Sequence, residues 1–241
     1  MKLNPIARGD LRRRLAGGKA LTMVTLYLSV LALLAFLSLP PDLGRLDDLR
    51  QEGLLVAFLI VETVLAAYLT SASACGEIAI DGEKSVVDLA ASPFTPPAVA
   101  RGKALTSFLF AALLVLVASP FSVLVAGIRG EALSAVAGAA LVAVGVAGAL
   151  GTLAALYGAV FESDFARSFV HWATLLALIV GATALPPPWD AASPVRLIVL
   201  LARRGLRPEA VASLTFYALL TLASGAGIDR RVRRIRATAR P

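Results

Sequence analysis

The amino-acid sequence predicts an all-α integral membrane protein, a bundle of six transmembrane helices. Three observations predict it: the composition, the length of the apolar blocks and the basic residues at both ends. Of the 241 residues, 58% are hydrophobic and only 16% are charged, and the mean hydropathy is +0.81. Soluble domains contain about 45–50% apolar and about 25% charged residues, so this chain has too little polar surface for a water-soluble globule.

The apolar blocks are long enough for helices that cross a bilayer, which needs about 20 residues each. A six-span domain over residues 21–228 is expected between a cytoplasmic amphipathic helix over residues 1–20 and a basic cytoplasmic tail over residues 229–241. A seventh apolar segment, residues 195–202, is too short to cross. It follows Ser193-Pro194, which is typical of a helix start, and we expect a re-entrant or interfacial helix before the sixth span. The six spans are expected at about residues 22–39, 53–75, 104–127, 132–160, 169–185 and 210–228.

The net charge of +7 comes from cations that flank the apolar blocks. With both termini in the cytoplasm, sixteen of the 23 Lys and Arg residues lie on the cytoplasmic side and seven on the other. The positive-inside rule favours this orientation in a cytoplasmic (inner) cell membrane. Cations in these places attract anionic lipid head groups, so they indicate a lipid bilayer and no nucleic acid as a partner.

Few residues could carry catalysis or bind a metal. With one cysteine, Cys75, and one histidine, His171, the chain can form neither an internal disulfide nor a multi-Cys or multi-His metal site. We expect no catalytic and no metal-binding residues, and His171 is more readily explained by packing than by ligation. The first apolar block is longer than the core of a signal peptide and is expected to be retained.

Glu62 is the one charged residue deep within an expected span. A charge at the centre of a bilayer costs about 2.5–3.5 kcal/mol on insertion scales, so such residues usually face protein or water. Two interpretations stay open: a role in a substrate pathway or subunit interface, or a protonated or hydrogen-bonded structural residue.

The fourth span is rich in glycine and alanine. Small residues let helices approach closely within a membrane. This pattern predicts a span buried in the bundle or at a subunit interface, and simple tight packing explains it equally well.

The N-terminal segment has the pattern of a helix that lies along the inner membrane surface. Ile6, Leu11 and Leu15 recur at near-helical spacing, with Arg8 and the run Arg12 to Arg14 between them. A disordered basic tail is the alternative interpretation.

The polar segment between the second and third spans predicts a short amphipathic helix on the cytoplasmic side. Its apolar residues from Val86 to Ala90 oppose Glu83, Lys84 and Asp88, and Pro93 must end the helix. Thr95-Pro96 then starts a new helix that runs on into the third span. Such an element can present a small rigid surface to a partner outside the membrane, or it can rest on the membrane surface.

The order of these elements resembles the permease subunits of type II ABC exporters, the class that contains sodium-efflux, drug-export and polysaccharide-export permeases. The likeness covers nearly the whole chain. The family's motif before the first span is matched by Asn4-Pro5-Ile6 and by Leu11 to Leu15. Its acidic stretch, apolar turn, Ser-Pro step and Gly-Lys pair are matched by Glu77 to Glu83, Asp88-Leu89, Ser92 to Thr95 and Gly102-Lys103. The family's usual Gly-Thr is replaced by Lys84-Ser85, which leaves the register of the segment open.

The resemblance implies that a separate ATPase binds this chain. The chain has no G-x-x-x-x-G-K-[ST] motif: Lys19 of Gly17-Gly18-Lys19 is followed by Ala20, and Gly82 to Ser85 lacks the Gly-Lys pair. ATP and magnesium are therefore expected on the partner, in two ATPase copies, and a second permease chain would complete a homodimer or heterodimer. The implied ATPase-coupling helix comprises Glu83, Lys84, Ser85, Val86, Val87, Asp88, Leu89, Ala90 and Ala91. The implied interfacial helix is marked by Asn4, Pro5, Ile6, Leu11, Arg12, Arg13 and Leu15.

Two other functional classes remain as alternatives. A membrane enzyme that processes lipids needs clustered carboxylates for a metal, or a His or Ser/Lys arrangement for acid–base chemistry. The nearest cluster is Asp81, Glu83 and Asp88, without a D-x-x-D-G-type pattern. A membrane scaffold or sensor that transports nothing is the other alternative. The sequence does not identify a substrate.

Overall fold

The computed structural model describes residues 4–16, 18–37, 54–76, 86–129, 133–187, 189–204 and 208–238. Within these residues the chain is helical and contains no strand, which confirms the predicted all-α class. The elements are α1 (Pro5–Ala16), α2 (Gly18–Leu37), α3 (Leu54–Cys75), α4 (Val86–Ala90), α5 (Pro96–Arg129), α6 (Leu133–Val160), α7 (Asp164–Ile179), the 3₁₀ turns η2 (Gly181–Ala184) and η3 (Trp189–Ala192), α8 (Pro194–Arg204) and α9 (Pro208–Thr238).

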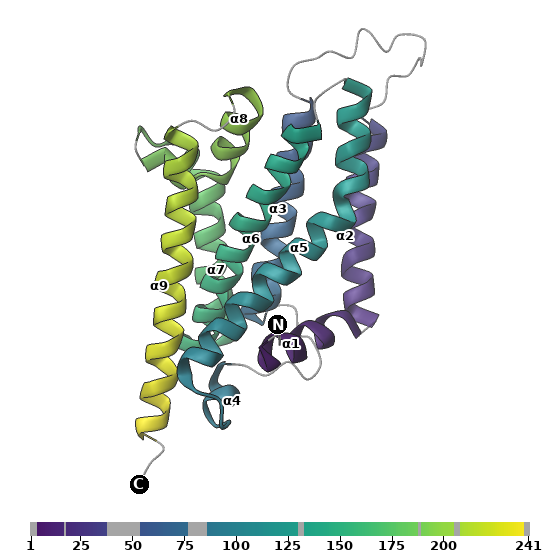
Figure 1. Cartoon of the computed structure of the whole chain (residues 1–241). Helices are drawn as coiled ribbons and strands as arrows, with labels where there is room; N and C mark the ends of the chain where they lie inside the picture. Colours follow the sequence, from purple (N-terminus) through teal and green to yellow (C-terminus); the bar gives the residue numbers. More distant parts are fainter. Residues whose placement is uncertain are drawn as a thin grey trace.

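The long helices run side by side as a bundle (Figure 1). Five segments of the described chain are long and apolar enough to cross a membrane: α3, α5, α6, α7 together with η2, and α9. They confirm a multi-pass membrane protein. α2 runs along the same bundle, but its apolar part, Leu21–Leu37, is shorter than the other five. The first predicted span ends at residue 39, beyond the described part of α2.

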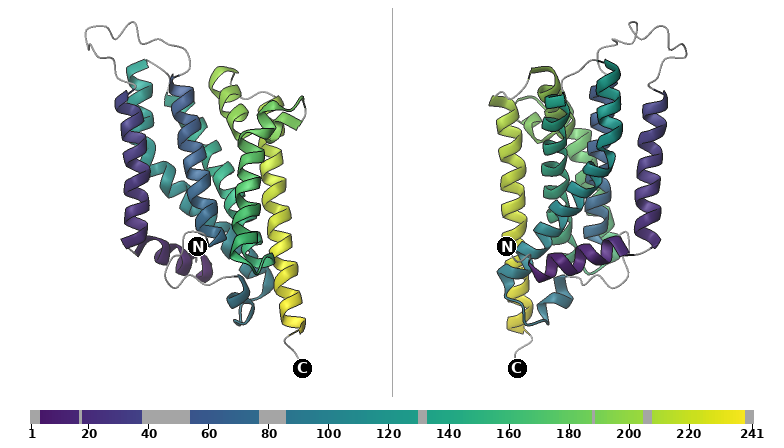
Figure 2. Two further views of the ribbon diagram at one scale, coloured as in Figure 1. Left: turned by 180° about the vertical axis from the view of Figure 1, so that it is seen from behind. Right: turned by 45° about the vertical axis from the view of Figure 1, so that its right-hand side comes forward.

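The two ends of the bundle carry different elements (Figures 1 and 2). α1 lies across one end, where α4 and the last turns of α9 are also found, and we call this the basal end. α8 and the 3₁₀ turns lie at the other, which we call the distal end. The two chain termini are both at the basal end.

α6 occupies the centre of the bundle because glycines on it admit its neighbours. It packs against α3, α5 and α9. A Cβ at Gly151 would lie 2.7 Å from Thr70 Cγ2 on α3 and 2.8 Å from Ser107 Cβ on α5. The Phe108 ring lies directly against Gly148. Gly148 and Gly151 of the fourth predicted span therefore serve close packing within the subunit, whereas a Cβ at Gly138 or Gly145 would meet no other residue within 4 Å.

α5 bends in its middle (Figure 1). Pro120 lies inside it and has no backbone N–H, so the carbonyl of Leu116 loses its usual helical donor. The Ser119 hydroxyl donates to that carbonyl at 2.7 Å. A proline kink is tolerated in an apolar helix when a nearby side chain replaces the lost donor in this way.

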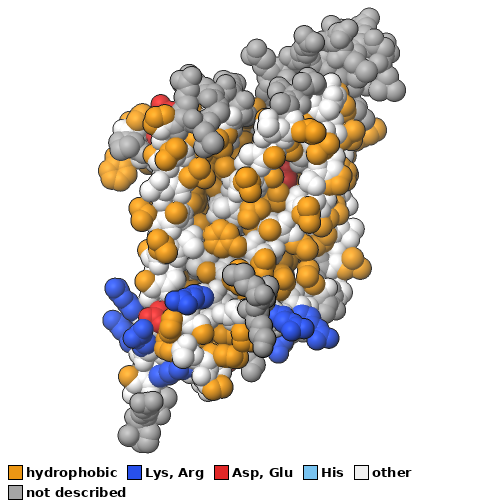
Figure 3. Space-filling model, in the orientation of Figure 1, with side chains coloured by type: hydrophobic (Ala, Val, Ile, Leu, Met, Phe, Trp, Pro, Cys, Tyr) orange, Lys and Arg blue, Asp and Glu red, His pale blue; other side chains and the backbone are white. Residues whose placement is uncertain are grey.

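The surface carries an apolar belt with cations at its basal edge (Figure 3). Large apolar side chains such as Leu26, Phe36, Leu141 and Leu222 are exposed on the belt. A belt of this kind suits contact with lipid rather than water.

Two helices extend beyond the predicted spans. α9 continues past residue 228 as one helix to Thr238, through the segment expected as a basic tail. α7 begins at Asp164, five residues before the predicted start of the fifth span, where the Ser163 side chain accepts a hydrogen bond from Ala166 N. Ser residues at this position favour a helix start.

Candidate functional site

α4 is the described part of the predicted coupling helix, and it is short. It comprises Val86 to Ala90, while Glu83, Lys84 and Ser85 lie outside the described residues. Val86, Leu89 and Ala90 are buried, and Asp88 and Ala91 are exposed. The five-residue helix therefore presents one polar edge outward and packs its apolar side on the bundle.

A small second core fixes α4 to the bundle. Its α4 members are Val86, Leu89 and Ala90, and it is separate from the larger core between the long helices. α5, α6 and α9 all contribute to it, and Ile6 joins it from α1. Its remaining fully enclosed members are Val99, Ala100, Ala155, Ala159, Ile228 and Val232. α4 itself contacts α5, α6 and α9, so a displacement of α4 would act directly on these three helices.

Arg236, on the last turns of α9, binds the segment that follows α4. Its Nε donates to the carbonyl of Ala90 at 2.9 Å, and its Nη2 donates to that of Ser92 at 2.7 Å. Nη2 also donates to the carbonyl of Phe94. One guanidinium thus contacts three carbonyls that would otherwise need water or another donor.

Arg231 makes a related contact one and a half turns earlier on α9. Its Nε donates at 3.0 Å to the carbonyl of Ala159, at the C-terminus of α6. A cation is favourable at a helix C-terminus, where unpaired carbonyls carry partial negative charge. Together Arg231 and Arg236 tie the basal part of α9 to α6 and to α4.

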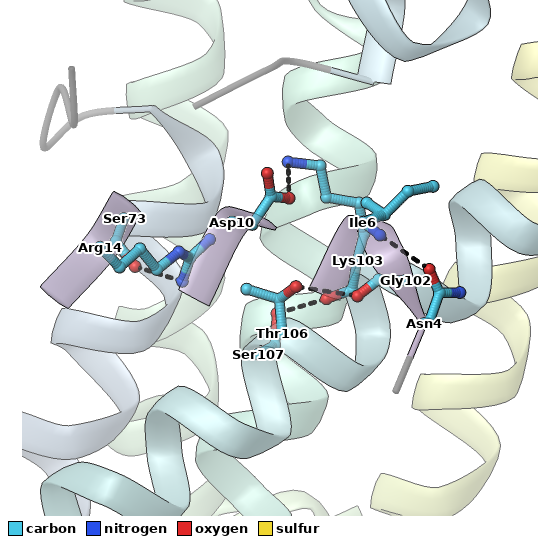
Figure 4. Close-up of polar contacts among 9 residues, drawn as sticks. All are labelled: Asn4, Ile6, Asp10, Arg14, Ser73, Gly102, Lys103, Thr106 and Ser107. Atoms are coloured by element: carbon cyan, nitrogen blue, oxygen red, sulfur yellow. Dashed lines mark hydrogen bonds and ion pairs between the residues drawn. The ribbon is translucent and has the colours of Figure 1, made fainter. Parts of the chain in front are cut away.

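α1 packs on the bundle through one face, which carries Asn4, Ile6, Asp10 and Arg14 (Figure 4). The Asn4 side chain accepts from Ile6 N at 3.0 Å and donates to the carbonyl of Ala98 on α5 at 3.0 Å. Ile6 lies against Gly102, where any Cβ would come within 2.8 Å of the Ile6 Cβ. Glycine at position 102 therefore lets the two helices meet.

Two charged residues of α1 are enclosed. Asp10 pairs with Lys103 at 2.8 Å, and both side chains are less than 10% exposed. Arg14 is 1% exposed, donates to the Ser73 hydroxyl of α3 at 2.8 Å, and lies over the Phe110 ring at 5.3 Å. The Gly102-Lys103 pair thus has a structural role beneath α1.

The residues predicted to mark the interfacial helix fall into two groups. Asn4 and Ile6 contact α5, and Leu11 packs partly against the larger core. Pro5, Arg12, Arg13 and Leu15 are exposed. The sequence pattern placed Arg14 among the cations that flank the first span, and the structure adds that its side chain is buried between α1, α3 and α5.

A groove lies between the basal parts of α5 and α9. It has a volume of about 300 Å³ and is lined mainly by small apolar residues, including Ala100, Ala104 and Gly225. Arg101 and Asp229 lie along it, and Asp229 pairs with Arg233 at 2.9 Å.

Glu62 and His171 are both buried within the bundle. Glu62 is 3% exposed and accepts a hydrogen bond from the Ser122 hydroxyl of α5 at 2.6 Å. His171 is 2% exposed, and its Nε2 lies 2.8 Å from the Ser71 hydroxyl of α3. His171 therefore bridges α7 and α3 within the subunit.

Sequence reasoning did not identify Asp10, Arg14, Arg231 and Arg236 as parts of the basal site. Ile6, Asp10 and Arg14 recur every four residues, a helical period that groups them on one face. Arg231 and Arg236 belong to a basic segment with six arginines, and nothing in the sequence distinguishes these two from the other four. In the described part of the chain, no three His, Cys, Asp or Glu side chains come together as a metal site would require.

A scan against protein-family models matched none of them, and a search of curated proteins found no match.

Proposed function

We propose that this chain is the membrane-spanning permease subunit of an ATP-binding-cassette exporter, driven by a separate ATPase. The observation that carries the proposal is the fixed α4 element. A short element with a polar edge, packed against α5, α6 and α9, is suited to receive force from a soluble partner and pass it to the bundle. ATP and magnesium belong to that partner, and two copies would act on two permease halves.

The proposal includes six crossings, with α2 as the first and shortest. α8, with only eleven residues, would be the re-entrant or interfacial helix before the last crossing. The basal end would face the cytoplasm. The cations of the sequence support that orientation, because sixteen of the 23 Lys and Arg residues fall in the segments assigned to the cytoplasmic side and seven in the others.

One such subunit would form half of a translocation pathway, completed by a second copy or a related chain. Closure of two ATPases can move two such halves only if ATP favours one arrangement by several kcal/mol. The groove between α5 and α9 offers an apolar surface next to Arg101, which would suit a lipophilic cargo or a lipid.

The two alternatives are a lipid-processing membrane enzyme and a scaffold or sensor. Product formed by the purified chain without any ATPase would favour the enzyme. ATPase binding without movement of any cargo would favour the scaffold.

The test is co-purification from native membranes in mild detergent, with a C-terminal tag, mass spectrometry and an ATPase assay. Charge reversal at the exposed Asp88, as Asp88→Arg, should remove an associated P-loop ATPase. Glu162→Arg is the matched control, because Glu162 is also exposed and lies at the basal end in the α6–α7 connection. Recovery of no P-loop ATPase with the unaltered chain, or equal loss in both variants, would contradict the proposal.

A further inference from the structure

A small polar cluster lies among the apolar helices, far from the basal site. It joins three elements: Glu62 on α3, Ser122 on α5 and Tyr27 on α2. Their side chains are 3%, 2% and 2% exposed, respectively. The Ser122 hydroxyl donates to Glu62 Oε2 at 2.6 Å. The Tyr27 hydroxyl has no hydrogen-bond partner among the described residues, and its helix, α2, packs against both α3 and α5.

Helix geometry places the three residues at one depth. Glu62 is eight residues from the distal end of α3 at Leu54, Ser122 is seven from that of α5, and Tyr27 is ten from that of α2. At about 1.5 Å of rise per residue, each lies roughly 10–15 Å below the distal end of its helix. This depth is within the hydrocarbon layer of a bilayer about 30 Å thick.

Among the described side chains, none forms an ion pair with the Glu62 carboxylate. Its own helix has no other charged residue, and neither does α5 between Ala104 and Ile128. The same is true of α6 throughout and of α2 from Leu21 onward, where Tyr27 is the titratable group. On α7, His171 contacts Ser71 of α3, nine residues from Glu62. On α8, which also packs against α3, Arg196 is paired with Asp190, and the side chains of Arg203 and Arg204 lie outside the described ones.

These surroundings make a permanently ionised carboxylate costly, because a buried charge needs a partner of opposite sign. They also provide for both protonation states. When Glu62 is ionised, the Ser122 hydroxyl donates to it. When it is protonated, Ser122 can still donate to Oε2, and Oε1 carries the proton.

We propose that Glu62 and its partner Ser122 form an intramembrane proton-binding site, at which the Glu62 carboxyl takes up one proton from water and releases it again. The site is independent of the proposed ATPase partner. Because the Ser122–Glu62 hydrogen bond joins α5 to α3, proton exchange would change a contact that holds these two helices together. Buried carboxylates in membrane helices are suited to such relays.

The test is carbodiimide labelling of the purified full chain in lipid nanodiscs. Dicyclohexylcarbodiimide reacts with protonated carboxyls in apolar surroundings. The carboxyl oxygen bonds to the carbodiimide carbon, the proton moves to a nitrogen, and rearrangement to an N-acylurea leaves the peptide heavier by the whole reagent. Mass spectrometry should find this addition on Glu62, and Glu62→Gln should abolish it. Asp10 is the internal control, because it is equally buried but paired with Lys103, and it should stay unlabelled.

Labelling should fall about tenfold for each pH unit above its midpoint, as measured between about pH 5 and about pH 9, where buried glutamates titrate. In Ser122→Ala the ionised form loses a donor, so the midpoint should rise by about one to two pH units. Ser119→Ala is the matched control, because that hydroxyl binds the Leu116 carbonyl on the same helix and should leave the midpoint unchanged.

Infrared spectroscopy tests the same site without reagent access. A protonated-carboxyl band that disappears at high pH and is absent from Glu62→Gln would support exchange. No such band and no labelling at any pH would overturn the proposal. A band and labelling that do not change with pH would assign Glu62 a permanent structural proton, which also overturns it. Suppression of labelling by sodium at fixed pH would replace the proton site with a monovalent-cation site.

Discussion

Arg12 and Arg14 lie two positions apart on α1 in opposite environments. Arg12 is exposed at the basal surface, whereas Arg14 is 1% exposed, with its guanidinium on the Ser73 hydroxyl and over the Phe110 ring. The two side chains point about 200° apart, at 100° per residue around a helix. At the scale of single residues, the face of the helix decides whether an arginine contacts solvent or neighbouring helices.

The Asp10–Lys103 pair yields a prediction at this scale. Asp10→Asn should destabilise the protein by about 3–5 kcal/mol, because it leaves the Lys103 ammonium buried without its counter-ion. Cys75 is buried and is the only cysteine, so the reaction of a thiol-specific fluorescent dye during heating reports unfolding.

Arg12→Gln serves as the control on the same helix and should change stability by no more than about 0.5 kcal/mol. The double variant Asp10→Asn/Lys103→Gln should be more stable than Asp10→Asn alone, since no buried charge is left uncompensated. Equal unfolding temperatures for Asp10→Asn and Arg12→Gln would show that the pair does not hold α1 in place.

At the scale of elements, the basal part of α9 is a structural component of the site. The bilayer needs about 20 residues of a helix, and α9 has 31. Its additional turns carry Val232 into the second core and Arg236 to the carbonyls of Ala90, Ser92 and Phe94. α4 and the last long helix are thus joined at the basal end.

Removal of the Arg236 contacts should loosen the segment after α4. In Arg236→Gln, backbone amides from residue 86 to residue 95 should exchange hydrogen at least about tenfold faster, because hydrogen bonds from a charged donor contribute about 1.5–3 kcal/mol each. Hydrogen-exchange mass spectrometry of the chain in nanodiscs measures this directly.

Arg234→Gln is the matched control for this measurement. Arg234 lies on the same turns of α9, and its side chain is exposed. Exchange in the segment should remain at the wild-type rate in this variant. A similar acceleration in both variants would indicate a general loosening of α9 in place of the loss of one specific contact.

At the scale of the whole molecule, patterns within single helices were predictable and contacts between distant segments were not. Apolar length alone predicted the helical class and the approximate position of each long helix. The burial of Arg14 depends on Ser73 and Phe110, which lie far along the chain, and no local period encodes that. Similarly, the sequence of residues 229–238 suggests a soluble basic tail. In the structure, Val232 and the preceding Ile228 pack in the second core with the apolar residues of α4.

The candidate sites show the same division. The sequence identified Glu62 as an unusual charge, but only the packing of α3 against α5 revealed Ser122 as its partner. Of the apolar residues predicted to form one face of α4, Val86, Leu89 and Ala90 are buried together, and the side chain of Val87 lies outside the described ones. The hydrogen bond between Arg236 and the carbonyl of Ala90 joins residues that are 146 positions apart in the sequence. A pattern within a single helix cannot predict such a contact.

The proposed six crossings and orientation predict which ends of the helices an external reagent reaches. In a Cys75→Ser background, Leu37→Cys marks the distal end of α2 and Thr238→Cys the basal end of α9, and both positions are exposed. If α2 crosses the membrane and the basal end is cytoplasmic, a membrane-impermeant maleimide added to intact cells should label position 37 and not position 238. Permeabilised cells should show labelling at both. Labelling of position 238 in intact cells would reverse the orientation, and protection of both positions would mean that α2 does not cross, leaving five spans and a different arrangement of the N-terminal segment.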